Sequence, residues 1–458
     1  MHIHILGIAG TMTAPLAVNL KKRGNYITGS DQEKIYPPVS NILKKLEIPI
    51  NSTDINTNID LAIIGSSYLA FKKTKEEFTQ IKKFHIPYIS ATNYIAQNIG
   101  QENSILIAGS FGKTTITSLL SWIFIKAKKN PNYMFAGYPK NKFEPINISP
   151  SDWSIIEADE SINGLDKKAK FLHYPLKYLL LTSADWEHKD SYSTRIKNFN
   201  AFKQLIINIP PDGTLLINSQ GYQTKELSLY AKSKIITYNS PFSDYYLEKI
   251  KINQNLTNLI IHTPRGLIKI QTQLIGQFNF ENILAAVAMA DHLNISFRNI
   301  QKAVFSFRGI KRRLEFIGEN NGVLFFDDFA QSSNRIKSTL EALNFHFPDK
   351  KIKVFFQPHA SFIQFKKSLI GLKSSFKKAD EVVLGPLKFN QKIDKTNRIT
   401  AKNFKKEIGK KLIYIPVEKD IITYYIHHLS SNDILVYMSS GGLSGNKVFK
   451  SIINNLKK

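Results

Sequence analysis

The 458-residue chain contains no cysteine, and this absence limits the chemistry open to it. Disulfide bonds and thiolate metal sites are excluded, so any bound metal must be held by oxygen or by histidine nitrogen. Long apolar runs are also missing, since none approaches the roughly 20 residues that cross a bilayer. The first residues lack the basic flank and the small-residue cleavage site of a signal peptide. We therefore expect a cytoplasmic protein that has no membrane partner.

Acidic residues are scarce compared with basic ones: 36 Asp and Glu face 62 Lys and Arg, a formal charge of +26. Such a charge invites a nucleic-acid interpretation. However, the lysines are dispersed along the chain, in pairs such as Lys21–Lys22 and Lys410–Lys411, with no basic block interleaved with aromatics. We expect solvated charge that helps to attract small polyanionic substrates, no nucleic-acid partner, and a monomer or weak homo-oligomer.

The most informative segment is a glycine-rich turn between an apolar run and a helical pattern. The run at 105–108 predicts a buried strand, and Ile116, Leu119, Leu120 and Ile123 recur at helical spacing. Between them lie Gly109, Ser110, Phe111, Gly112, Lys113, Thr114 and Thr115. Glycines let backbone N–H groups surround phosphate oxygens, while a lysine reaches the outer phosphates and a threonine hydroxyl reaches Mg²⁺. The sequence thus predicts an ATP-binding phosphate loop, shorter than the common G-x-x-x-x-G-K-[ST] form; a chance glycine-rich turn is the alternative.

Residues 1–102 predict a nucleotide-binding βαβ unit. An apolar strand enters a glycine turn containing Gly7, Gly10 and Thr11, and a second strand ends at Ser30 and Asp31 about 20 positions later. In such units the turn backbone meets a diphosphate and the acidic residue meets a polar group of the ligand. A complete G-x-G-x-x-G is absent, so this pattern alone is weak.

Residues 103–308 place carboxylates and one histidine after predicted strands. A strand delivers Glu157 and Glu160, and His188 follows another strand among acidic residues. Open α/β sheets bind ligands at these strand ends, which favours a metal site over a structural histidine. Asn279 and Asn282 open a helix and are either ligand-binding residues or simple helix caps.

Residues 309–458 again alternate strands with helical segments. The strands predicted at 323–326, 352–356, 381–384, 412–415 and 434–438 mostly end in polar or glycine-rich turns. Lys311, Arg312 and Arg313 precede them, either as a solvated charge run or as guanidinium groups for a transferring phosphoryl group. The whole pattern predicts an α/β protein of three domains, at 1–102, 103–308 and 309–458.

These motifs, in this order, resemble the Mur ligase family from end to end. The motifs are Gly109 to Thr115, Glu157 to Glu160, His188 with Asp190, Asn279 to Asn282, Arg312–Arg313 and Asp327–Asp328. The resemblance implies a Rossmann-like N-terminal domain for the UDP-sugar, a central P-loop ATPase-like domain and a Rossmann-like C-terminal domain. It also implies an ATP-dependent, amide-forming enzyme of bacterial peptidoglycan metabolism.

The resemblance also implies residue roles. Gly7, Gly10, Thr11, Ser30 and Asp31 should hold the UDP-sugar, and residues 109–115 the ATP phosphates. Thr114 and Glu157 should bind one Mg²⁺ and His188 a second. Asn282 should meet adenine, Arg313 the γ-phosphate and Asp328 the ribose, with Lys113, His188 and Arg313 as the catalytic residues.

Within the family the chain is most similar to the branch that joins UDP-N-acetylmuramate to the recovered peptide L-Ala-γ-D-Glu-meso-diaminopimelate. The stretches that carry this similarity are 29–31 with 36–40, 166–174 and 311–315. The family reaction runs through an acyl phosphate made from the lactyl carboxylate and the γ-phosphate. Ligation of a single L-alanine is the alternative, and a nucleotide-binding homologue with reduced or lost activity is another.

Several site positions depart from the usual family pattern. Phe111 replaces a histidine, Gln331–Ser332 replace paired histidines, and Ser183 replaces an asparagine. Ala14–Pro15 and Phe278 replace two glycines and a histidine. Because Lys113, Thr114, Glu157, His188 and Asp328 are kept, ATP binding is better supported than turnover.

Overall fold

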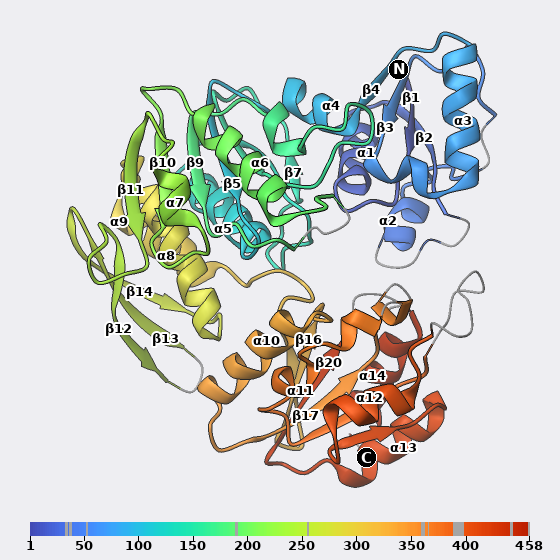
Figure 1. The fold of residues 1–458 in the computed structure, drawn as a ribbon, viewed down its shortest axis with the longest axis vertical. Coiled ribbons are helices and arrows are strands. Elements are labelled where there is room, and N and C mark those ends of the chain that lie inside the picture. Colours follow the sequence, from blue (N-terminus) through green and yellow to red (C-terminus); the bar gives the residue numbers. More distant parts are fainter. Residues whose placement is uncertain are drawn as a thin grey trace. The chain divides into compact units, whose positions relative to one another are not determined.

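A computed structural model describes residues 1–32, 35, 39–51, 54–187, 191–253, 256–358, 362–364, 366–387, 398–439 and 443–456. Within them the chain divides into two compact units (Figure 1). The first comprises Met1–Leu274 and Asn279–Gly309, and the second comprises Ile275–Phe278 and Ile310–Lys458. None of the described helices is both long and apolar enough to cross a membrane.

The N-terminal part of the first unit is a parallel four-stranded sheet in the order β2-β1-β3-β4. Strand β1 is buried along most of its length, because its isoleucines and Leu6 face packed helices on both sides of the sheet. The elements are β1 (His2–Leu6), α1 (Thr13–Lys22), β2 (Tyr26–Ser30), α2 (Val39–Lys45), β3 (Leu61–Ile64), η1 (Ser66–Ala70), α3 (Lys72–Lys83), β4 (Tyr88–Ser90) and α4 (Ala91–Asn98).

A seven-stranded sheet follows, in the order β11-β10-β9-β5-β8-β6-β7, and all of its pairs except β6–β7 are parallel. Its central strand, β5, leads into the phosphate loop. Its elements are β5 (Asn103–Ala108), α5 (Lys113–Lys126), β6 (Asn132–Met134), β7 (Ile146–Asn147), β8 (Trp153–Glu157), η2 (Lys170–His173), β9 (Tyr178–Leu181), α6 (Arg195–Ile207), β10 (Thr214–Asn218), α7 (Thr224–Ser228), β11 (Lys234–Tyr238), α8 (Gln277–His292) and α9 (Phe297–Ser306).

A separate three-stranded antiparallel sheet lies between β11 and α8 in the chain. It consists of β12 (Tyr246–Ile252), β13 (Thr257–Thr263) and β14 (Gly266–Thr272). Our sequence analysis assigned no strands here, although alternate residues of β13, including Leu259 and Ile261, are buried with the period of two that marks a strand with one face covered.

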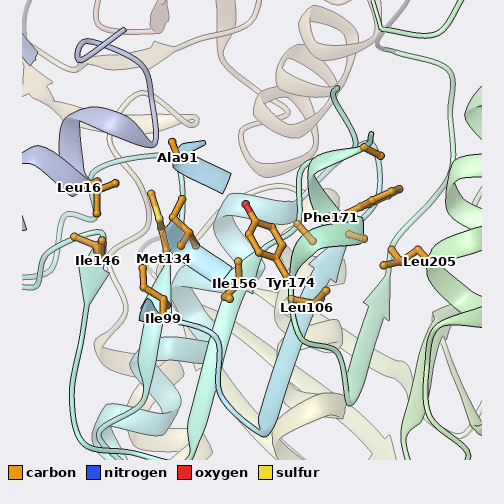
Figure 2. Close-up of a cluster of buried hydrophobic side chains, with 14 of the residues drawn as sticks. Leu16, Ala91, Ile99, Leu106, Met134, Ile146, Ile156, Phe171, Tyr174 and Leu205 are labelled. Carbon is orange, nitrogen blue, oxygen red and sulfur yellow. The ribbon is translucent and has the colours of Figure 1, made fainter. Parts of the chain in front are cut away.

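The first two sheets share one hydrophobic core. Ala91 and Ile99 of the N-terminal part pack in the same cluster as Met134, Ile156 and other residues of the seven-stranded sheet (Figure 2). Buried apolar area of this kind is the main force that holds elements together, at about 25 cal/mol per Å². The N-terminal sheet is therefore held against the phosphate-loop sheet by apolar packing.

The second unit contains a six-stranded sheet in the order β15-β16-β20-β17-β18-β19, in which only β15–β16 is antiparallel. The five strands predicted from the sequence are all present. The elements are β15 (Glu315–Asn320), β16 (Val323–Asp328), α10 (Ser333–His346), β17 (Lys351–Phe356), η3 (Phe362–Gln364), η4 (Lys366–Leu369), α11 (Leu372–Ser375), β18 (Glu381–Leu384), α12 (Ala401–Ile408), β19 (Leu412–Tyr414), α13 (Glu418–His428), β20 (Asp433–Met438) and α14 (Leu443–Asn455).

Candidate functional site

The phosphate loop packs against, and hydrogen-bonds with, the residues that follow the neighbouring strand β9. Gly109 has a φ of +120°, and a Cβ there would overlap the Thr182 hydroxyl. Thr182 Oγ1 in turn donates to the Phe111 carbonyl (2.8 Å), and the Ser110 N–H donates to the Ser183 carbonyl (3.1 Å). The strand, turn and helix predicted from the sequence are thus present, and the turn is fixed by strand β9.

The Lys113 side chain is folded back over the loop. Its Nζ donates to Glu160 Oε2 (2.7 Å) and to the Gly109 carbonyl (2.6 Å). Burial alone would lower the pKa of Lys113, but the charge and hydrogen bond of Glu160, together with the charges of Asp159 and Glu157, outweigh this, and the pKa is raised. The ammonium is therefore charged and lies against the loop, between the Gly109 carbonyl and Glu160.

Thr114 and Glu157 form a pair of hard oxygen ligands beside the loop. Thr114 Oγ1 and Glu157 Oε1 are 2.9 Å apart, both residues are buried, and Glu157 Oε2 accepts the Ala136 N–H (2.7 Å). Octahedral Mg²⁺, with bonds of about 2.1 Å, needs adjacent ligands about 3.0 Å apart, so this pair fits Mg²⁺. His188, predicted as a metal ligand and catalytic residue, and Asp190 lie outside the described residues, as do residues 36–38.

Among the residues that the structure describes, no three His, Asp or Glu side chains gather closely enough to form a complete metal cage.

Helix α8 brings Asn282 against the phosphate loop. Gly112 has a φ of +80°, and a Cβ there would overlap Asn282 Oδ1. Asn282 Nδ2 lies 3.5 Å from Asn279 Oδ1, and both side chains are buried. Because α8 begins at Gln277, Asn282 lies in the second turn of the helix, where helix capping does not account for it, whereas Asn279 is in the first turn. Thr115, which is buried at the start of α5, completes the loop.

In the N-terminal sheet, the predicted UDP-sugar residues meet at the turn after β1. Gly7 N–H donates to the Ser30 carbonyl (2.7 Å), and Asp31 Oδ2 accepts the Ala9 N–H (2.8 Å). Burial raises the pKa of Asp31. Its carboxylate stabilises the turn through the hydrogen bond from the Ala9 N–H. Gly10 and Thr11 lie nearer the surface of this turn.

In the second unit, Asp328 braces the loop that carries the arginines. Its two carboxylate oxygens accept the N–H groups of Leu314 (2.6 Å) and Ala330 (2.7 Å). Burial raises the pKa of Asp328 against the pull of these donors and of Arg313. The carboxylate predicted to bind ribose is thus already engaged with backbone, which the sequence did not indicate.

Arg312 is also engaged within the second unit. Its guanidinium lies 3.4 Å from the Asp327 carboxylate and donates to the Ser439 carbonyl. Arg312 therefore has structural partners in Asp327 and the Ser439 carbonyl, which the sequence did not indicate.

Sequence reasoning missed the role of Glu160 and of the Ala136 N–H. The sequence pattern places Glu160 among carboxylates at a strand end, three residues after Glu157, but does not pair it with Lys113. Its contact with Lys113 spans 47 residues and no local pattern predicts it. The contact of the Ala136 N–H with Glu157 could not be predicted from residue type, because a backbone group makes it.

Three family models, all of Mur ligase domains, match the chain. Residues 2–102 match "Mur ligase family, catalytic domain", residues 107–290 match "Mur ligase middle domain", and residues 312–441 match "Mur ligase, glutamate ligase domain". Their order agrees with the three-domain architecture expected from the sequence.

Individual relatives carry two different activities in their names. A UDP-N-acetylmuramate–L-alanine ligase of Pelagibacter ubique is 30% identical over 96% of both chains. A UDP-N-acetylmuramate–L-alanyl-γ-D-glutamyl-meso-2,6-diaminoheptandioate ligase of Escherichia coli is 28% identical over 84% of both.

Solved structures show the same fold. A UDP-N-acetylmuramate–alanine ligase of Thermotoga maritima superposes with a TM-score of 0.79 at 20% identity, covering 99% of both chains. A murein peptide ligase of Psychrobacter arcticus superposes with a TM-score of 0.72 at 24% identity, covering 100% of this chain and 99% of the other.

Proposed function

This chain belongs to the Mur ligase family of ATP-dependent, amide-bond-forming ligases, and we propose that it joins UDP-N-acetylmuramate to the peptide L-Ala-γ-D-Glu-meso-diaminopimelate in peptidoglycan recycling. The observation that carries the ATP-dependent part is the buried group of Lys113, Thr114 and Glu157 at the phosphate loop. The choice of peptide rests on the sequence similarity at 29–31, 166–174 and 311–315.

Within this proposal, the chain's residues position and neutralise charge. The lactyl carboxylate attacks the γ-phosphate and releases ADP, and the peptide amine then displaces phosphate from the acyl phosphate. Lys113 and the N-terminus of α5 neutralise the phosphate charge, and Asn282 supports the loop from α8. Thr114 and Glu157 would hold Mg²⁺, which supplies charge stabilisation at the phosphate oxygens when bound.

The segment at 166–174 supports the peptide assignment by its place. Lys170 Nζ contacts Asp159 Oδ2 (2.8 Å), two residues from Glu157, and Asp166 Oδ2 lies 3.1 Å from His173 Nε2. A segment attached this close to the proposed metal ligands is suited to influence which amine substrate is accepted.

Ligation of L-alanine is a second candidate. It is favoured by coverage, since the L-alanine ligases of Desulfitobacterium hafniense and Pelagibacter ubique match 99% and 96% of this chain, whereas the Escherichia coli peptide ligase matches 84%.

The test is phosphate release from ATP and Mg²⁺ in the presence of UDP-N-acetylmuramate, with either the tripeptide or L-alanine, and with product masses as the second readout. We expect release and a ligated product with the tripeptide. A higher kcat/KM with L-alanine would assign the chain to the second activity. Nucleotide binding without product from either amine would identify a homologue that has lost ligation.

A further inference from the structure

We propose that Glu160 is a positioning residue that holds the Lys113 ammonium away from nucleotide and so weakens the binding of ATP and ADP. This inference rests on the proposed ATP-dependent function. The contact that carries it is the 2.7 Å ion pair between Lys113 Nζ and Glu160 Oε2, in which Glu160 is 1% exposed. Hydrogen bonds between charged groups are about twice as strong as neutral ones, so this contact competes effectively for the lysine.

The second contact of Lys113 shows that its side chain is retracted. Its Nζ also donates to the carbonyl of Gly109, the first residue of the loop (2.6 Å). A lysine that reaches a β- or γ-phosphate must point out of the loop towards the ligand. Two of the three N–H donors of Lys113 are engaged by Glu160 and Gly109, so phosphate must compete with these partners for the ammonium.

Glu160 cannot follow the lysine, because its backbone is anchored. The Glu160 carbonyl accepts the Tyr192 hydroxyl (2.5 Å). On either side of it, the Asp159 carbonyl accepts the Phe171 N–H (3.2 Å) and the Ser161 carbonyl accepts the Lys170 N–H (3.0 Å). The carboxylate thus stays in place while the flexible lysine side chain moves.

The competition has a consequence for product release. ADP and ATP both carry the β-phosphate that the lysine reaches, so Glu160 opposes the binding of both. A carboxylate that reclaims the ammonium as ADP leaves favours dissociation of the product. Glu160 therefore lowers the affinity for nucleotide and speeds the release of ADP at the end of each catalytic cycle.

The test is calorimetric titration of the full chain with ADP, ATP and AMP. Glu160→Gln keeps the shape of the side chain but removes its charge, and we expect the Kd for ADP and ATP to fall about tenfold, the scale of one charge-assisted hydrogen bond. AMP has no β-phosphate, so its Kd should stay within about twofold of the parent value. A residue needed only for folding would weaken nucleotide binding when changed, so tighter binding is the distinguishing result.

The matched control is Asp159→Asn. Asp159 is the adjacent carboxylate, with a side chain 24% exposed, and it pairs with Lys170 (2.8 Å), so the variant removes the same charge from the same segment but leaves the Lys113–Glu160 contact. We expect a smaller gain in ADP affinity than with Glu160→Gln. Equal gains in the two variants, or an unchanged ADP Kd in folded Glu160→Gln, would overturn the inference.

Glu160→Asp provides a second variant if Glu160→Gln does not fold. It keeps the charge but shortens the side chain by one methylene, so the ion pair loosens and ADP should bind about threefold more tightly; an unchanged Kd would contradict the inference. Because ADP binding needs no ligation, a parent that binds ADP but makes no product would contradict the proposed function without altering the effect expected of Glu160.

Discussion

The hydroxyl of Thr114 donates to the carboxylate of Glu157 across 2.9 Å, and both side chains are buried at the start of helix α5. Thr114 belongs to helix α5 and Glu157 to strand β8, and the two residues are 43 positions apart in the chain. The distance between their oxygens nevertheless suits adjacent ligands of one Mg²⁺ ion.

Glu157→Gln should therefore lower the ligation rate about 100-fold and raise the Mg²⁺ concentration needed for half-maximal activity, because an amide is a neutral and weaker ligand. Phosphate release titrated with MgCl₂ measures both. Glu226→Gln, on the exposed part of α7, is the control and should behave as the parent. Mn²⁺ should replace Mg²⁺, and stoichiometric zinc in the purified protein would contradict this oxygen site.

Lys113→Ala should reduce ligation by about 10³-fold, because it deletes the ammonium that neutralises the β- and γ-phosphates. Lys126→Ala removes a lysine from the last turn of the same helix and should leave activity unchanged. Circular dichroism and thermal melting establish that both variants fold. Ligation by folded Lys113→Ala within a few-fold of the parent would exclude this role.

Gly112→Ala should weaken ATP binding about tenfold, since its Cβ would overlap Asn282 Oδ1 and displace the loop. Gly24→Ala is the matched control: its φ of +88° resembles the +80° of Gly112, but no atom lies within 4 Å of its Cβ. Both changes cost about 1–2 kcal/mol of backbone strain, so only the difference between them reports the Asn282 contact. Equal ATP affinities in the two variants would disprove that contact's importance.

The double change Gln331→His with Ser332→His should raise the ligation rate, while the parent should be slow but bind ATP normally. Gln331 and Ser332 lie between β16 and α10, at positions where the sequence resemblance implies paired histidines. Neither residue can carry positive charge or shuttle a proton near neutral pH, and such a contribution is worth about 10²–10⁴ in rate. Ser338→His on the exposed surface of α10 is the control. A folded double variant that binds ATP and gains nothing is the contrary result.

Asp327 should make folding stability depend on pH. Burial raises its pKa from 3.8 to about 6, although Arg312 opposes the shift. Because the folded-state pKa is above the unfolded one, the folded protein holds more protons between about pH 4 and 6, and its stability falls as pH rises through that window. The loss amounts to at most about 3 kcal/mol.

Asp327→Asn removes this titration, so the melting temperature of the parent relative to the variant should fall between pH 4.5 and 7. Comparing the two proteins cancels the titration of carboxyl groups that do not interact with Asp327. A constant difference in melting temperature across this range would show that Asp327 does not titrate there.

The sequence by itself determined the parts of the site that are local in the chain. The phosphate loop was predictable because strand β5, its glycines, Lys113 and helix α5 are contiguous, and the conformation that binds phosphate follows from that order of residues. The parallel sheets were predictable for the same reason, since alternating apolar strands and amphipathic helices admit few other arrangements. The three-stranded sheet at 246–272 was overlooked although its alternating pattern is readable in β13.

Only the tertiary structure decided which polar groups meet across long stretches of chain. The positions of Asp31 and Asp328 in the sequence suggested ligand contacts. In the folded protein, both carboxylates accept hydrogen bonds from backbone N–H groups. The contacts of Lys113 with Glu160 and of Gly112 with Asn282 likewise join segments 47 and 170 residues apart. A buried charge must find a partner wherever packing places one, and that partner is set by the geometry of the whole core and not by the spacing of residues along the chain.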